Sequence, residues 1–291
     1  MSSSHQHPSL SSQLAVSGHV DLSTFDSRAT TGFDGSKAEG KAALVELGDE
    51  LGDLQERLFA NGRSGASSTR VLLVLQGMDT SGKGGVIDHA LGLLSPNGFR
   101  LTSFKKPTED ELAHDFLWRI DQALPDPGMV GVFDRSHYED VLVGRVHELA
   151  DAKEIERRYA AINEWEKDLV DSGTVVIKCM LHMSFEKQRE RLLARLDDPD
   201  KRWKFKPGDI DERAHWDDYQ KAYEVALERC NTDSAPWYVV PSDRKWYRNW
   251  AVGNLVLEAL QGMRLEWPEP DYDVAEQRAR LTAPHQESPN R

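Results

Sequence analysis

The chain contains 291 residues, of which 39% are hydrophobic, so it can supply the core of one large domain or two small ones. A net charge of -13 and a pI near 5.3 argue against a nucleic-acid partner, because general nucleic-acid binders carry a basic surface. No apolar run reaches the roughly 18 residues of a membrane span, no secretory signal is visible, and Cys179 and Cys230 have no metal or disulfide spacing. We therefore expect a cytoplasmic protein with no membrane partner.

The N-terminal part of the chain divides into two segments. Residues 1–36 include ten serines and few large apolar residues, so we expect a disordered or loosely attached arm there. Residues 37–60 then carry a leucine stripe at alternating steps of three and four, which predicts an amphipathic helix packed on the core. The leucines of this stripe are Leu44, Leu47, Leu51, Leu54 and Leu58.

Strand patterns alternate with helical patterns through the rest of the chain. The predicted strands are 71–76, 99–104, 129–133, 174–181 and 236–240. The predicted helices are 83–94, 109–123, 151–171, 184–196, 210–231 and 244–262. Nearly continuous apolar strands that alternate with helices indicate a parallel sheet covered on both faces. We therefore expect an α/β domain over residues 37–265, built on a central parallel five-stranded sheet, and a tail over 266–291.

The first predicted strand runs into the sequence GMDTSGKGG, residues 77–85, which we call the glycine loop. A loop that leaves a strand and opens a helix directs backbone N–H groups at one point, where an anion binds well. The sequence nearly matches the phosphate loop G-x-x-x-x-G-K-[ST], but a glycine replaces the final hydroxyl residue. Four glycines and one lysine are the candidate phosphate-binding residues: Gly77, Gly82, Gly84, Gly85 and Lys83.

Two aspartates are candidate metal ligands. Asp79 would repel a phosphate bound in the glycine loop unless a metal lay between them, and Mg2+ prefers oxygen ligands. We expect Asp79 to replace the missing hydroxyl, with Mn2+ as a second candidate ion; a capping role for Asp79 is the alternative. Asp134 ends the predicted strand 129–133, where it would share the ion, and Arg135 beside it would reach a phosphate oxygen.

Residues 184–213, which we call the lid segment, interrupt the regular alternation. Their stretch 196–212 is polar and contains two prolines, and a long polar connection inside a compact domain is usually functional. Residues 187–213 also hold nine basic and seven acidic side chains within an acidic chain. We interpret this segment as a mobile lid that holds an anion, with an ordinary surface loop as the alternative.

The helix predicted at the start of the lid segment has one polar face. Gln188, Arg191 and Arg195 recur at steps of three and four, so they share that face. We expect it to grip phosphate groups. The alternative is a solvated face whose charge is compensated by Glu186 and Glu190.

Five stretches in the same order and at similar spacing resemble the polyphosphate kinase 2 family: GMDTSGKGG, FKKPTEDELAHDFLWR, FDRSHYEDVLVGRVH, KQRERLLARLDDPDKRWKF and APWYVVPSDRKWYRNW. The resemblance covers about residues 40–265. It implies a three-layer P-loop kinase fold similar to thymidylate kinase, with a helical lid. It also implies reversible phosphoryl transfer between inorganic polyphosphate and nucleotides, and a homo-oligomer, either a dimer or a tetramer.

The resemblance further implies roles for individual residues. Asp79 and Asp134 match magnesium ligands of the family, and Lys83 matches a lysine that contacts phosphates. Arg191 and Arg195 match lid residues that grip the polyphosphate chain.

The acceptor side of the site is implied by the motif FDRSHYED. Family members that perform one phosphorylation step commonly carry asparagine at the position of Glu139, whereas this form resembles class III, which accepts nucleoside mono- and diphosphates. Glu139 would then lie beside the acceptor; a helix-start role is the alternative. Lys105 and Lys106 follow the second predicted strand and would extend the anionic path.

Two other functions remain as alternatives at this point. A conventional ATP-dependent nucleotide kinase would use the same fold with ATP as donor. A catalytically silent protein that binds nucleotide or polyphosphate would be expected to lack Asp79, Lys83 or Asp134, and all three are present.

Overall fold

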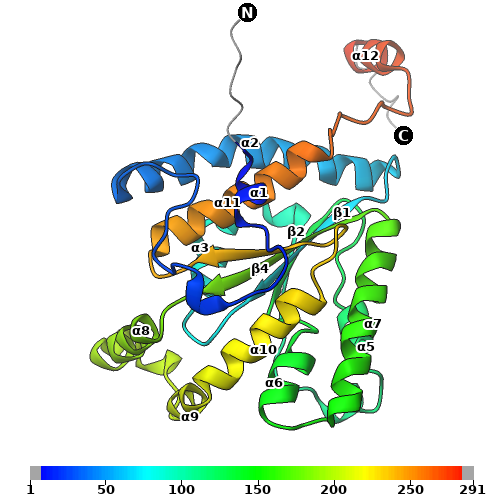
Figure 1. The fold of residues 1–291 in the computed structure, drawn as a ribbon. Coiled ribbons are helices and arrows are strands. Elements are labelled where there is room, and N and C mark those ends of the chain that lie inside the picture. The colour runs from blue at the N-terminus through cyan, green and yellow to red at the C-terminus, as the bar shows by residue number, and fades with distance from the viewer. Residues whose placement is uncertain (1–7, 284–291) are drawn as a thin grey trace, which may run out of the picture.

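The computed structural model describes residues 8–283 (Figure 1). Five strands form one parallel sheet in the order β2-β3-β1-β4-β5. Their bounds are β1 Arg70–Gln76, β2 Phe99–Ser103, β3 Val130–Asp134, β4 Thr174–His182 and β5 Trp237–Pro241. Because all the strands are parallel, the loops after their carboxyl ends meet at one edge of the sheet. The predicted α/β fold with a central parallel five-stranded sheet is confirmed.

Helices cover both faces of the sheet (Figure 1). One layer comprises α2 (Lys37–Ser64), α3 (Lys83–His89) and α11 (Lys245–Gly262), and the other comprises α6 (Glu139–Val146), α7 (Ala152–Asp171) and α10 (Trp216–Arg229). Successive residues of β1 enter opposite cores: Leu73 packs in the α2 and α11 layer, and Leu72 and Val74 pack in the α7 and α10 layer. This double burial explains why β1 is continuously apolar.

The predicted amphipathic helix corresponds to α2. Ser36 and Glu39 form a capping box at its start, and Gly65 ends it in the left-handed conformation with φ 73°. Leu51 and Leu58 are fully buried, which confirms that the leucine stripe faces the core.

Several predicted helices are shorter or divided. Further helices are α4 (Glu109–Leu112), α5 (Trp118–Asp121), α8 (Phe185–Asp197), α9 (Gly208–Ala214) and α12 (Val274–Thr282). Short 3-10 helices occupy Leu22–Thr24, Leu91–Leu93, Pro96–Gly98 and Pro199–Lys204. The predicted helix 109–123 is interrupted because Asp115 accepts a hydrogen bond from the backbone N–H of Leu117, which favours a turn over helix continuation.

The prediction of a disordered arm over residues 1–36 is wrong for residues 8–36. Helix α1 (Leu10–Leu14) packs Leu10 and Leu14 into the α2 and α11 layer, and Glu258 of α11 accepts the backbone N–H of Leu10 at 2.7 Å. Ala15 then forms an antiparallel bridge with Tyr238, so this segment covers the edge strand β5. Residues 1–7 lie outside the described part of the chain.

Within residues 266–283 the C-terminal tail forms one helix, α12, which extends from the body of the domain. In Figure 1, α12 lies apart from the two helical layers, and none of its residues is buried. No helix within residues 8–283 combines the length and the apolar character that crossing a membrane requires.

Candidate active site

The glycine loop connects β1 to α3 at the carboxyl edge of the sheet. Gly77 and Gly82 adopt φ of 146° and 110°, which side chains on L-residues rarely allow. Gly82 is the N-cap of α3 and no side chain caps that helix, so the alternative capping role of Asp79 at α3 is not observed. A Cβ built at Gly84 meets no atom within 4 Å. Crowding therefore does not explain why a glycine stands at the position of the hydroxyl residue in the phosphate-loop pattern.

Lys83 folds back across the glycine loop. Its Nζ donates to the carbonyl of Gly77 at 2.9 Å, and only 9% of the residue is exposed. Burial lowers the pKa of Lys83 and nearby Arg135 reinforces this, while the carboxylates of Asp79 and Asp134 oppose it. The structure therefore brings together the four residues for which we predict a catalytic role, Asp79, Lys83, Asp134 and Arg135.

Arg135 follows β3 and links the glycine loop to the start of α6. Its guanidinium donates to Asp79 Oδ1 at 2.8 Å and to Glu139 Oε2 at 3.0 Å. The charge of Glu139 is the main cause that raises the pKa of Arg135. Glu139 is the first residue of α6 and also faces the site, so it combines the two positions considered for it. In the orientation that gives both the nitrogen and the oxygen of its side-chain amide a partner, Gln76 donates to Glu139 Oε1 at 3.0 Å.

The aspartate pair has the donor chemistry of a magnesium site. Asp134 is the last residue of β3 and pairs in register with Leu75, two residues before the glycine loop. Among residues 8–283 no group of three or more His, Cys, Asp or Glu forms a metal cage. Mg2+ is usually held by one or two carboxylates together with waters and substrate phosphates, so two aspartates fit it.

Helix α8 turns its polar face toward the glycine loop. Gln188 Nε2 donates to the Asp79 carbonyl at 3.1 Å, and Arg191 Nη1 donates to the carbonyls of Thr80 and Ser81 at 2.8 and 3.0 Å. The alternative of a solvated face is therefore wrong for Gln188 and Arg191. Arg191 also has a buried Nε without a partner in the described chain.

Arg195 occupies a different environment from Arg191. Its Nη1 donates to the Lys204 carbonyl at 3.1 Å and approaches Asp209 at 3.4 Å, so it is held within the lid segment. Lys105 and Lys106 follow β2 and are exposed; Arg119 binds the Lys105 carbonyl at 2.9 Å. Within residues 8–283, Arg195, Lys105 and Lys106 make no hydrogen bond to the glycine loop.

A pocket of about 180 Å³ opens between the glycine loop, α6 and α10. Asp79, Arg135 and Glu139 form its charged wall. Its other wall includes Tyr219 and Tyr223 of α10, which the sequence reasoning missed. The pattern of α10 marks these tyrosines only as residues of a buried helical face, because their position beside the site depends on how α10 packs on α6.

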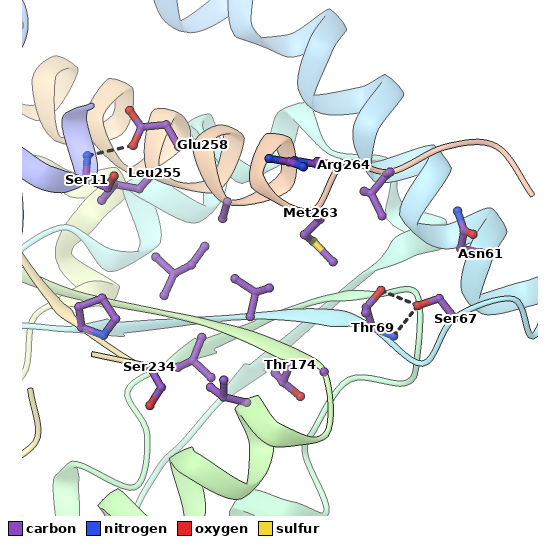
Figure 2. A pocket seen from close by; sticks show the side chains of 18 of the residues that line it. Ser11, Asn61, Ser67, Thr69, Thr174, Ser234, Leu255, Glu258, Met263 and Arg264 are labelled. Atoms are coloured by element: carbon purple, nitrogen blue, oxygen red, sulfur yellow. Dashed lines mark hydrogen bonds between the residues drawn. The ribbon is translucent and has the colours of Figure 1, made fainter. Parts of the chain in front are cut away.

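A second hollow, of about 690 Å³, lies at the opposite end of the strands (Figure 2). Thr69 and Thr174 mark the amino ends of β1 and β4 there, and Met263 approaches from the end of α11. None of the candidate site residues lines it. Cavity size alone therefore does not locate the active site.

Comparison with known proteins agrees with this geometry. The family model described as Polyphosphate kinase 2 (PPK2) matches residues 34–268. The chain is 45% identical to a protein of Meiothermus ruber named AMP/ADP-polyphosphate phosphotransferase, over 87% of this chain and 93% of that protein. It is 38% identical to a Rhodopseudomonas palustris protein named ADP-polyphosphate phosphotransferase, over 86% and 89%. The crystal structure of Polyphosphate Kinase 2 from Arthrobacter aurescens TC1 superimposes with a TM-score of 0.92 at 52% identity, over 94% of this chain and 96% of that one.

Proposed function

The chain belongs to the polyphosphate kinase 2 family, and we propose that it transfers the terminal phosphoryl group of inorganic polyphosphate to nucleoside mono- and diphosphates. The observation that carries this function is the convergence of Asp79, Arg135 and Glu139 on one pocket beside the glycine loop, in which Lys83 is bound to the Gly77 carbonyl. A relative named for both AMP and ADP supports this range of acceptors, and one named for ADP supports its diphosphate part.

The reaction exchanges one phosphoanhydride for another. A terminal oxygen of the acceptor phosphate attacks the terminal phosphorus of polyphosphate, one P–O bond forms, and the terminal anhydride P–O bond breaks. The shortened polyphosphate chain leaves with the electron pair. Because the acceptor phosphate is largely ionised at neutral pH, the protein needs no strong general base, and the reaction is reversible. Positioning and charge neutralisation are its main contributions.

The cationic residues divide this work. Lys83 and Arg135 face the carboxylate cluster and would balance the charge on the transferring phosphoryl group. Arg191 holds the glycine loop through Nη1 and keeps a buried Nε for a phosphate oxygen. Arg195 would contact the polyphosphate chain farther along the lid segment, and Lys105 and Lys106 would border its path.

We propose that Asp79 and Asp134 hold Mg2+, or Mn2+ in its place. The ion, when bound, neutralises phosphate charge and so favours approach of the two anionic substrates. In the structure Asp79 is paired with Arg135 through Oδ1, which leaves its other oxygen for a metal or a metal-bound water. This arrangement would fix the position of Arg135 as well.

We propose that Glu139 sets the acceptor range. Its two oxygens are occupied by Arg135 and, in the favoured amide orientation, by Gln76, so its carboxylate is fixed at the pocket wall. A fixed carboxylate keeps the acceptor at a defined distance by repulsion or through a bridging ion. This supports the class III assignment, in which a mono- and a diphosphate are used in succession.

We also propose that the enzyme is a cytoplasmic homo-oligomer, either a dimer or a tetramer. Cys179 and Cys230 are buried free thiols, which fits a reducing compartment. Family membership supports self-association.

The test is an incubation with Mg2+, long-chain polyphosphate and AMP, without ATP, followed by anion-exchange chromatography. We expect ADP first and ATP afterwards. ADP alone would refute the two-step range, whereas absence of product with AMP and ADP would refute the function itself. Asp134→Asn should lower the rate by at least about hundredfold. The matched control is Asp126→Asn, an exposed aspartate before the opposite end of β3, which should keep full activity.

A further inference from the structure

Arg248 is a buried cation beneath the glycine loop. It lies in the first turns of α11 and is 2% exposed. Its Nη1 donates to the Ser81 carbonyl at 3.1 Å, and its Nε and Nη2 donate to Asn249 Oδ1 at 3.1 and 2.8 Å. No carboxylate of residues 8–283 lies within 4.0 Å of this guanidinium. A buried arginine normally has an anionic partner, so Arg248 lacks its expected counter-charge.

The same guanidinium limits the side chains that the glycine loop can carry. A Cβ at Gly82 would lie 1.7 Å from Arg248 Nη1, and a Cβ at Gly85 would lie 2.6 Å from Nη2. A Cβ at Gly84 would meet nothing. The glycines at 82 and 85 therefore allow Arg248 to approach the loop backbone, while the side at Gly84 is left open.

A second arginine binds the loop at the same atom. Arg191 Nη1 donates to the Ser81 carbonyl at 3.0 Å, so one carbonyl accepts from two guanidinium groups. Burial, with the positive charge of Arg191, lowers the pKa of Arg248 to about 9. Burial and the charges of Arg191 and Arg248 also lower the pKa of Lys245, at the start of α11. The positive charge on this side of the loop thus exceeds what nearby carboxylates balance.

We infer that Arg248 is a positioning residue for the polyphosphate donor, an inference that rests on the proposed function. It holds the Ser81–Gly85 backbone against α11, and its charge is balanced when the donor phosphates occupy the open side of the loop. Arg248 acts through the loop and does not touch the reacting atoms. Loss of its charge should therefore weaken donor binding more than acceptor binding.

The first variant is Arg248→Met, which keeps a long side chain and removes the charge. Because Arg248 acts on the donor only through the glycine loop, we expect KM for polyphosphate to rise by about three- to thirtyfold. The KM for the nucleotide acceptor should change by less than about threefold. The rise in melting temperature that saturating polyphosphate produces in the wild type should shrink in the variant.

Asn249→Ala is the second variant, because it keeps the charge and releases the side chain that orients Arg248. It should raise KM for polyphosphate in the same direction but less. Arg63→Met is the control, since Arg63 is exposed at the end of α2 and belongs to no part of the site. It should match the wild type in every measurement.

The outcomes separate this inference from the proposed function. If the wild type neither uses polyphosphate nor is stabilised by it, the proposed function fails. If the wild type does both, the inference is overturned by an unchanged KM for polyphosphate, by equal rises in both KM values, or by a loss confined to kcat. Should Arg248→Met not fold, Asn249→Ala decides by the same criteria.

Discussion

The turn that carries Arg135 and Glu139 is anchored by a buried polar network. Tyr138 OH donates to Glu166 Oε1 at 2.8 Å, and His137 Nε2 lies 3.2 Å from the same oxygen. Lys178 of β4 pairs with the other carboxylate oxygen of Glu166 at 2.5 Å. Burial alone would raise the pKa of Glu166, but Lys178 and His137 hold it below its ordinary value. Glu166 and Lys178 therefore position a turn whose flanking residues line the pocket beside the glycine loop.

Lys178→Met should destabilise the fold by about 3–5 kcal/mol, because it leaves the Glu166 carboxylate buried without its partner. Urea unfolding followed by circular dichroism measures the change. Adding Glu166→Leu should recover much of the loss, since the pair is then apolar. Lys167→Met is the control, because Lys167 pairs with Asp171 on the exposed face of α7. The unfolding midpoint of this variant should stay at the wild-type value. Equal effects at Lys178 and Lys167 would contradict the anchoring role.

At the level of whole elements, the strands and the glycine loop were predictable because their signals are local. An apolar run followed by glycines and a lysine specifies a strand, a turn and a helix start from neighbouring residues alone. The face shared by Gln188 and Arg191 was predictable for the same reason. Arg248 was not identified as a site residue, because its contact with Ser81 spans 167 positions and depends on how α11 packs on α3.

The N-terminal segment shows where composition misleads. Serine dominates residues 1–36, yet the few apolar residues of this segment are spaced to reach both cores around the edge strand β5. Those that are buried are Leu10, Leu14, Val16, Val20 and Leu22. A disorder estimate averages over residues, whereas a segment that adds to an existing sheet edge needs only a few apolar contacts.

Leu14→Ala tests whether this segment belongs to the cooperative fold. Leu14 is 5% exposed, so its truncation should cost about 2–5 kcal/mol of stability. The measurement is the urea midpoint of the full-length chain. Leu281→Ala, on the outlying helix α12, serves as the control because Leu281 is 87% exposed, and it should have no effect. If Leu14→Ala were also without effect, the segment would not be packed in solution as the structure has it.

On the scale of the whole molecule, a chain of negative net charge gathers cations at one place. The net charge is -13, whereas Lys83 of the glycine loop is joined there by Arg135, Arg191 and Arg248. The net charge repels a polyanionic donor, and these four cations offset that repulsion at the glycine loop. Both His137 and His182 are also buried, which makes overall stability depend on pH in a defined direction.

Stability should fall on acidification below neutral pH. Burial lowers the pKa of His137 and His182 below the ordinary value of 6.5, so the folded state binds fewer protons than the unfolded state. The stability that the two neutral histidines contribute is complete above their pKa in the unfolded state. It is lost as the pH falls through 6.5 toward their lower pKa values in the folded state. The urea midpoint should therefore be lower at about pH 5.5 than at about pH 7.5. In His182→Gln, whose amide can still donate to the Phe25 carbonyl, the urea midpoint should decrease less on acidification than in the wild type. In the control His89→Gln, at an exposed position, the midpoint should decrease as much as in the wild type. A midpoint that stayed constant or rose on acidification would show that these histidines are not held neutral by the fold.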